Sequence, residues 1–532
     1  MSSVVVPESD LPVPSGTPRE VRPFSWAEYL IVPAIICFQL LVLGDPIPFT
    51  HSFWLDEIHT QLLVEDSSIT HAATALASGV DFNPPTYYGL ARLVSQIGPS
   101  PEISQRVFSL ICVIFCCVCV YRLVRDDCSP IVATAAATLI WSFEVVQIQA
   151  FESRFYAPWL AATALTALCL QRVSVTPNVV WTIGLILGST MMCTVHYFGV
   201  ISLALLAGTQ LLRNMVRRRG GLSFVFWLIP AIVGLSICIV LFYRGQRSAL
   251  SVATWVPEIS WKSTQQFLQE LVPIWAIPIA FVIWILSRRV ASEATEEPRE
   301  TQADPGIPAA IGLSLMPVCL ILFSVLLQPS LVSRYGTVSS IGFAVIIAML
   351  LRPTPKLAAA AFTIWFFVAG LQNLGTQLDR WHRTEDRQKE MIARLRQVDS
   401  EVPLLFESRH TMYPITRYAP DLAPRIQFLA LSNDNLRDFV SVTPFRIVER
   451  DVAIKIEEFY PAFQTFPHDK LKDLPKAILV AFRQRKDFGR QLEGLTVAQL
   501  QPQIYEIRPA ASDAIPEPHQ KPPEGESVVG NK

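Results

Sequence analysis

A succession of apolar stretches of membrane-spanning length constrains this chain more than any other feature. About 20 apolar residues form a helix that crosses a bilayer, and in lipid only helices and closed barrels satisfy their own backbone hydrogen bonds. The sequence predicts about eleven spans, in the windows 27–44, 104–121, 130–150, 156–171, 179–195, 197–212, 222–243, 265–287, 308–328, 335–351 and 357–373. We therefore expect a polytopic α-helical membrane protein.

Charged residues divide the chain into two unequal parts. Of its 44 Lys and Arg and 45 Asp and Glu residues, 46 lie in residues 374–532, about 29% of those positions, against about 12% before residue 374. Because soluble chains carry about 25% charge, the first part fits a membrane body and the second a water-exposed domain. The net charge of −1 gives no field that would attract nucleic acid.

Composition and pattern predict the domain organisation. The polar, proline-rich residues 1–25 and the tail 509–532 are expected to be disordered. Residues 26–375 form the membrane domain, with a long first outer loop at 46–103 that carries amphipathic helices. Residues 376–508 form a soluble α/β domain, which begins with a helical pattern and continues with β-like runs at 402–406, 425–431, 477–482 and 503–507.

Positive charges in the short loops predict the orientation. With the N-terminus in the cytoplasm, the inner loops carry twelve Lys and Arg residues and the outer loops seven. An odd number of spans then places residues 376–508 outside the cell membrane. All ten cysteines lie before residue 374, so no disulfide framework is available to this outer domain.

The first outer loop contains an acidic pair directly after an aromatic residue: Trp54, Leu55, Asp56 and Glu57. A carboxylate that is partly desolvated at the water interface can act as a general base towards a hydroxyl. The pair can equally cap the amphipathic helix expected over 58–76. Further along the same loop, Asp81 precedes Tyr87 and Tyr88.

Three further polar clusters lie where predicted spans meet the outer face. They are Glu144 with Glu152, Arg154 and Tyr156; His196 with Tyr197; and Ser333, Arg334 and Tyr335. On one continuous helix Glu144 and Glu152 would share a face. A guanidinium group binds phosphate at two points, but an internal Glu152–Arg154 pair, interface anchoring of the arginines and a hydrogen-bonded structural His196 remain open. Together the clusters suit a substrate with a phosphate and hydroxyl groups.

This ordered set of residues resembles the GT-C membrane glycosyltransferases, in particular the bacterial relatives of protein O-mannosyltransferases and of the lipid A aminoarabinose transferase. The resemblance covers roughly residues 27–373. The matching residues are Trp54-x-Asp56-Glu57, Asp81-x-x-Pro84-Pro85-x-Tyr87-Tyr88, Glu152-x-Arg154-x-Tyr156, His196-Tyr197 and Ser333-Arg334-Tyr335.

The resemblance implies an enzyme that moves a sugar from a polyprenyl-phosphate donor to a hydroxyl of a glycan, lipid or protein acceptor, with inversion. Asp56 would be the general base, Glu57 the other member of the catalytic pair, and Arg154 and Arg334 the ligands of the donor phosphate. The implied substrate pocket comprises Asp81, Tyr87, Tyr88, Glu152, Tyr156, His196, Tyr197 and Tyr335. The implied location is the bacterial inner membrane.

Some members of this family bind a divalent metal beside the first-loop acid and others need none, so the metal stays open, with His59 and His196 as candidate ligands. A transporter or flippase of a lipid-linked or anionic substrate is the main alternative, and an envelope polymerase or ligase is another. Transporters often show internal repeats, and none is visible in this sequence. In the outer domain, residues 407–410 and Tyr413 are expected to form a surface loop.

Overall fold

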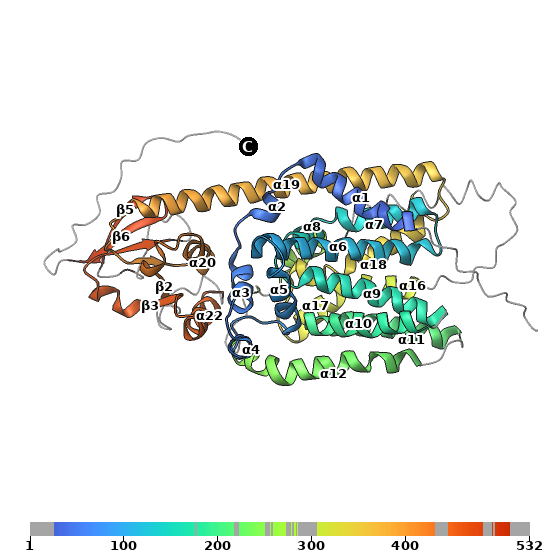
Figure 1. Ribbon diagram of the computed structural model, residues 1–532, viewed down its shortest axis with the longest axis horizontal. Coiled ribbons are helices and arrows are strands. Elements are labelled where there is room, and N and C mark those ends of the chain that lie inside the picture. Colours follow the sequence, from blue (N-terminus) through green and yellow to red (C-terminus); the bar gives the residue numbers. More distant parts are fainter. Residues whose placement is uncertain are drawn as a thin grey trace, which may run out of the picture.

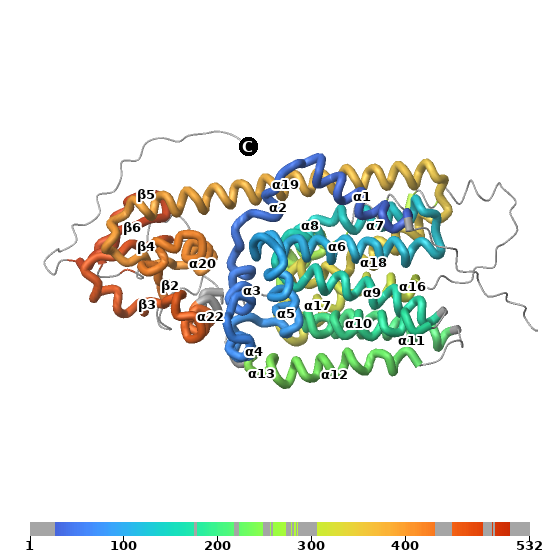
Figure 2. Tube along the Cα trace, viewed as in Figure 1, coloured from blue at the N-terminus to red at the C-terminus, as the bar shows by residue number. Residues whose placement is uncertain are grey.

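The computed structural model describes residues 26–175, 178–217, 223–249, 259–272, 306–430, 445–481 and 495–510, and the single positions 256, 278, 281, 282, 285 and 492. This part of the chain is elongated, with a helix bundle at one end and a sheet with its helices at the other (Figure 1). The 41-residue helix α19 (Lys356–Arg396) runs along both (Figure 2). At 1.5 Å per residue it extends about 60 Å, twice the roughly 30 Å of a bilayer core. The predicted boundary between residues 375 and 376 therefore lies inside one helix.

The bundle is built from helices that follow the apolar windows. They are α1 (Trp26–Leu43), α6 (Pro101–Arg125), α9 (Tyr156–Val175), α10 (Val179–Val195), α11 (Gly199–Arg217), η1 (Ser223–Leu228), α12 (Ile229–Cys238), η2 (Ile239–Tyr243), α13 (Arg244–Ala249), α14 (Trp261–Leu271), α16 (Ile307–Ser314), α17 (Met316–Leu326), η3 (Ser333–Gly336) and α18 (Ser339–Leu351). Much of the predicted window 265–287 lies outside the described residues.

Several of these helices are suited to a membrane. Within the described ranges, five helices are long and apolar enough to cross one, or six if a bent pair counts as a single span. Shorter apolar helices occur at Ala27–Leu43, Val179–Val195 and Ser339–Leu351. The total of about eleven spans stays a prediction.

The predicted continuous helix over 130–150 is wrong. The chain breaks into α7 (Pro130–Ser142) and α8 (Glu144–Ala150), whose axes differ by 74°, because Phe143 between them is extended. The break separates the two glutamates expected on one face. Glu144 is half-exposed and pairs with Arg380 at 2.5 Å, whereas Glu152 follows the end of α8 and points into the site described below.

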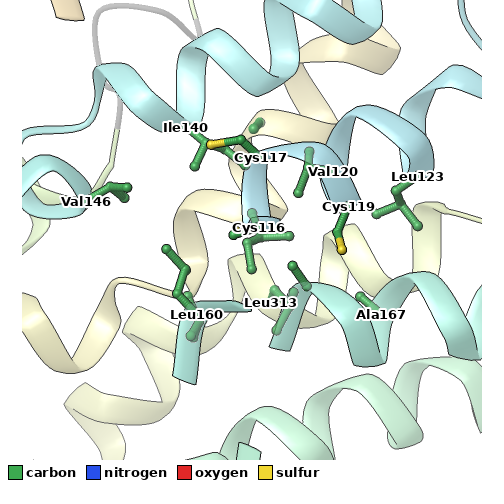
Figure 3. Packing of buried hydrophobic residues seen from close by; sticks show 14 of the residues in the cluster. Cys116, Cys117, Cys119, Val120, Leu123, Ile140, Val146, Leu160, Ala167 and Leu313 are labelled. Carbon is green, nitrogen blue, oxygen red and sulfur yellow. The ribbon is translucent and has the colours of Figure 1, made fainter. Parts of the chain in front are cut away.

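Small side chains pack the centre of the bundle. Cys116, Cys117 and Cys119 of α6 are buried, and Figure 3 shows them among apolar side chains that include Leu160 and Ala167 of α9. All ten cysteines lie in described residues and all are free thiols. The seven buried ones serve as small hydrophobic groups that allow close helix packing.

The first outer loop folds into four short helices: α2 (Ile47–Thr50), α3 (Leu55–Val64), α4 (Ile69–Ala77) and α5 (Thr86–Ser95). The helix expected over 58–76 is thus two helices. Ser68 begins the second, since its hydroxyl accepts a hydrogen bond from the His71 amide at 3.2 Å. The loop forms a layer between the bundle and the sheet domain (Figure 1).

In its described residues the sheet domain has six strands, in the order β3-β2-β1-β4-β6-β5. The first four strands pair in parallel, and β6 runs antiparallel to both β4 and β5. The elements are β1 (Leu404–Phe406), α20 (Arg409–Tyr418), η4 (Ala423–Arg425), β2 (Ile426–Ala430), α22 (Phe445–Phe459), β3 (Gln464–Pro467), η5 (His468–Asp473), β4 (Ala477–Val480), β5 (Leu495–Gln501) and β6 (Ile504–Pro509). Central β1 is buried along its whole length, which explains its uninterrupted apolar sequence.

Helix α20 attaches the sheet domain to the first outer loop. Arg417 donates to both carboxylate oxygens of Glu65, at 2.9 and 2.7 Å. The Tyr418 hydroxyl accepts from the Phe53 amide at 2.8 Å and donates to Glu102 at 3.0 Å. These directional contacts fix α20 against both ends of α3 and the first turn of α6.

Candidate active site

Asp56 stands in the first turn of α3 and faces a basic side chain from a distant segment. Its Oδ2 lies 3.2 Å from Nη1 of Arg334, and both side chains are about one-fifth exposed, at 21% and 18%. The Arg334 guanidinium lies 5.7 Å from the ring centres of both Trp54 and Tyr156. The structure thus brings together an acid and an arginine that the sequence placed in separate clusters.

Arg154 fixes the other side of α3. Its Nη1 donates to the Asp56 carbonyl oxygen at 2.6 Å, to the Thr60 hydroxyl at 2.7 Å and to Oδ2 of Asp81 at 2.8 Å. The side chain is 5% exposed, and its guanidinium lies over the Phe155 ring. These three contacts occupy Nη1, so only the remaining nitrogens of the Arg154 guanidinium are left for another group.

The carboxylate of Glu57 has different partners from that of its neighbour Asp56. The Glu57 carboxylate forms a fully buried ion pair with Arg106 at 2.9 Å and accepts from the backbone amides of Ser153 at 2.6 Å and Trp54 at 3.2 Å. These contacts fix the start of α3 against the bundle. In place of the catalytic role predicted for it, we assign Glu57 a positioning role, because its oxygens are enclosed by protein groups.

The charges around Asp56 determine its ionisation. Burial raises the pKa of the Asp56 carboxyl, but the positive charges of Arg334 and Arg154 outweigh burial and hold this pKa below its usual 3.8. Burial lowers the pKa of nearby His59 to about 3, so this imidazole is uncharged at neutral pH. Asp56 is therefore an anion held by Arg334, and it becomes a stronger base when another anion occupies that arginine.

Glu152 has the opposite character. Burial, and to a smaller extent the negative charge of Glu57, raise the pKa of the Glu152 carboxyl to about 8. Its backbone oxygen accepts from the Ser109 hydroxyl at 2.7 Å. The Glu152–Arg154 ion pair that the sequence left open does not form, since Arg154 pairs with Asp81. Near neutral pH Glu152 is mostly a carboxylic acid that can donate a hydrogen bond.

We expect Glu152→Gln to stabilise the protein at alkaline but not at acidic pH. The unfolded chain releases this proton near 4.5 and the folded chain near 8. Between these values the folded state binds more protons, so wild-type stability falls as the pH rises, by at most about 1.4 kcal/mol per unit for this group. Glutamine does not titrate, so the variant's unfolding midpoint should equal that of the wild type near pH ~4 and exceed it near pH ~8.

Thermal unfolding across this pH range measures the effect, and Glu144→Gln, on the half-exposed carboxyl bound to Arg380, is the control. An unchanged pH dependence in Glu152→Gln would contradict the assignment of a raised pKa.

An aromatic group borders the site on the bundle side. The His196 ring stacks on Trp159 at 4.5 Å, and its Nδ1 accepts from the Phe198 amide at 3.0 Å. The ring centres of Tyr156 and Tyr335 lie 5.6 and 5.7 Å from the centre of the His196 ring. His196 is thus a hydrogen-bonded packing residue, which was the alternative that the sequence left open.

The remaining tyrosines predicted for the pocket occupy two different places. Tyr87 and Tyr88 are buried in α5, with their ring centres 6.0 Å apart, and support the wall next to Arg154. Tyr197 contacts the same loop from the other side: its hydroxyl donates to Gln246 at 2.9 Å, and the Gln246 amide donates to the backbone oxygen of Asn83 at 3.1 Å.

Helix α20 of the sheet domain also reaches the site, which the sequence did not predict. Arg409 and Tyr413 are buried, and the Tyr413 ring meets His59 edge-on at 5.6 Å. Burial lowers the pKa of His410, and the nearby charge of Asp56 acts in the opposite direction. The surface loop expected over 407–410 and Tyr413 is therefore wrong. These residues are enclosed because α20 packs on α3.

The described residues contain no group of three or more His, Cys, Asp or Glu side chains that could hold a metal ion. His59 and His196, the candidate ligands, occupy separate surroundings, one beside Tyr413 and the other on Trp159. Neither histidine is assigned to a metal here.

Comparison with known proteins supports the fold. No protein-family model matches the chain, and no curated protein matches it. The chain is similar to the crystal structure of ArnT from Cupriavidus metallidurans bound to undecaprenyl phosphate, with a TM-score of 0.54 and 12% identity over 92% of this chain and 99% of that chain. The arabinosyltransferase EmbB from Mycobacterium smegmatis gives a TM-score of 0.37 at 12% identity, over 83% of this chain and 42% of that chain, too low to define a fold.

The chain therefore shares its overall fold with this ArnT structure, a likeness that agrees with the fold expected from the sequence resemblance. Asp56 of α3 and Arg334 of η3 lie 3.2 Å apart, and α3 lies between the helix bundle and the sheet domain (Figure 2).

Proposed function

We propose that this protein is an integral membrane glycosyltransferase that moves a sugar from a polyprenyl-phosphate donor to a hydroxyl group of an acceptor. The observation that carries the proposal is the Asp56–Arg334 pair, 3.2 Å apart, because it sets a base beside a phosphate ligand. The likeness to an ArnT structure that holds undecaprenyl phosphate supports the donor class.

In the proposed reaction the donor phosphate binds Arg334 and takes the place of the Asp56 carboxylate. Asp56, released from its partner, accepts the proton of the acceptor hydroxyl as that oxygen attacks the anomeric carbon. The bond from this carbon to the phosphate oxygen breaks, and polyprenyl phosphate leaves as an anion that Arg334 stabilises. A single displacement inverts the anomeric centre, and no protein acid is needed at the leaving group.

The proposed setting is the extracytoplasmic face of a bacterial inner membrane. This setting rests on predictions from the sequence. They are about eleven spans, a cytoplasmic N-terminus, a membrane domain at 26–375 and an outer domain at 376–508. The chemistry at Asp56 then lies at the outer headgroup level, where the lipid chain of the donor holds its sugar. Acceptors that fit are a glycan, a lipid or a protein.

Product analysis tests the proposal. The purified protein in nanodiscs is incubated with a radiolabelled polyprenyl-phosphate sugar and an envelope extract, and mass spectrometry compares envelope lipids and glycans from cells with and without the protein. Appearance of a new glycoside together with free polyprenyl phosphate supports a transferase. Movement of an unaltered lipid-linked sugar across the bilayer would contradict it and indicate a flippase.

Arg334→Gln is expected to lower kcat/KM for the donor by about a hundredfold, because a hydrogen bond to a charged group contributes about 1.5–3 kcal/mol. Arg334→Lys keeps the charge but loses the planar fork, so its loss should be smaller and appear mainly in KM. Steady-state kinetics with varied donor measures both. The control is Arg247→Gln on the exposed end of α13, and an Arg334→Gln enzyme with unchanged donor kinetics would refute the phosphate role.

A further inference from the structure

A cavity of about 680 Å³ lies where the first outer loop, the outer part of α19 and α20 meet. Its wall is formed by residues 51–54, Glu152, the side of α19 between Trp381 and Arg394, and, from the sheet domain, His410, Thr411, Pro414, Ile415 and Gln503. This volume lies within the range of sites for small molecules. The cavity shares Trp54 and His410 with the surroundings of Asp56, so it opens towards the candidate active site.

Aromatic and polar groups alternate along this wall. Trp54 and Trp381 offer flat apolar faces, and Gln388 offers an amide. The Gln388 amide donates to the Ser52 hydroxyl at 3.4 Å, and both side chains lie on the wall and are partly exposed. Such groups can exchange this long contact for hydrogen bonds to the hydroxyl groups of a ligand. Rings with apolar faces and many hydroxyls are characteristic of saccharides.

The charge of the wall narrows the ligand class further. Its charged residues are Glu385 and Glu390, which are acidic, and Arg387 and Arg394, which are basic, while Glu152 is mostly protonated near neutral pH. Arg394 also pairs with Glu390. A site for a phosphorylated acceptor would carry more basic than acidic side chains. This wall has no such excess of basic side chains.

We infer that this cavity binds the saccharide part of a neutral acceptor glycan and delivers its hydroxyl to Asp56 past Trp54. The inference rests on the proposed glycosyltransferase function and adds the acceptor class to it. It also gives the sheet domain a role, since α20 supplies one wall.

The test uses the full-length protein in nanodiscs. Calorimetric titrations with cellohexaose, maltohexaose and mannohexaose, and with lipid A as a phosphorylated acceptor, compare binding. We expect at least one neutral hexasaccharide to bind more tightly than lipid A. Trp381→Ala should weaken this binding about tenfold, as aromatic anchors do. Gln388→Ala should weaken it about fivefold, as loss of a hydrogen bond does.

Gln388→Ala removes a partly exposed side chain and is the safer variant, because Trp381 also stacks on His51 at 5.2 Å. Arg383→Ala, also on α19 but outside the cavity wall, is the control and should bind as the wild type does. Binding of lipid A alone, or hexasaccharide binding that Gln388→Ala leaves unchanged, overturns the inference.

Donor consumption measured in parallel separates the two proposals. Sugar transfer to lipid A but to no hexasaccharide would leave the glycosyltransferase standing and overturn the neutral-glycan inference. Hexasaccharide binding that depends on Gln388, with no consumption of any polyprenyl-phosphate sugar, would support the cavity assignment and contradict the proposed enzyme.

Discussion

Asp56→Asn is expected to reduce sugar transfer by about a thousandfold or more while donor binding persists, since a positioned base contributes about 10²–10⁴ to a rate. Asparagine keeps the size of the side chain but cannot accept the acceptor proton. It also frees Arg334 from its partner at 3.2 Å, so the donor should bind at least as tightly. Single-turnover transfer and donor binding, measured separately, should thus move in different directions.

The matched control is Asp45→Asn. Asp45 lies at the start of the same loop and pairs with His382 at 2.6 Å on the surface, so its loss should leave transfer within about twofold, as for a surface ion pair. Normal transfer by Asp56→Asn would refute the base assignment. Equal loss of donor binding and of transfer would indicate that Asp56 only holds Arg334 in place.

The helix bundle could be predicted because a long apolar segment in lipid must satisfy its own backbone hydrogen bonds, which it does by forming a helix. Windows such as 104–121 and 335–351 coincide with α6 and α18. The 74° break at Phe143 could not be predicted, because neither proline nor glycine marks it in the sequence. Strands β3 and β5 were also missed, since their exposed residues lack the apolar run that revealed β1.

The candidate site could be predicted in part. An isolated charged residue at the end of an apolar segment was the signal that pointed to Arg334, and the structure places Arg334 beside Asp56. Sequence could not separate Asp56 from Glu57, because neighbours on a helix differ by 100° in direction and only the folded bundle shows which of them meets Arg106. The approach of α20 to α3 depends on tertiary contacts such as Arg417–Glu65, which no local pattern reveals.

The buried ion pair behind the site should dominate its stability. Arg106 and Glu57 are both fully buried and 2.9 Å apart, and Arg106 also donates to the backbone oxygens of Phe49 and His51. Arg106→Met removes the cation and leaves the Glu57 carboxylate enclosed without its partner. Breaking a buried pair in this way costs about 3–5 kcal/mol, so the variant's unfolding free energy should fall by that amount.

Reversible unfolding in mixed micelles measures this loss. The second variant, Arg106→Met with Glu57→Gln, has no buried charge and should recover a large part of the stability, because the cost comes from the unpaired charge rather than from the lost contact. Arg92→Met on α5 of the same loop is the control. If the double variant were as unstable as Arg106→Met, hydrogen bonds of Arg106 to the loop backbone, and not its pairing with Glu57, would hold α3 and hence Asp56 in position.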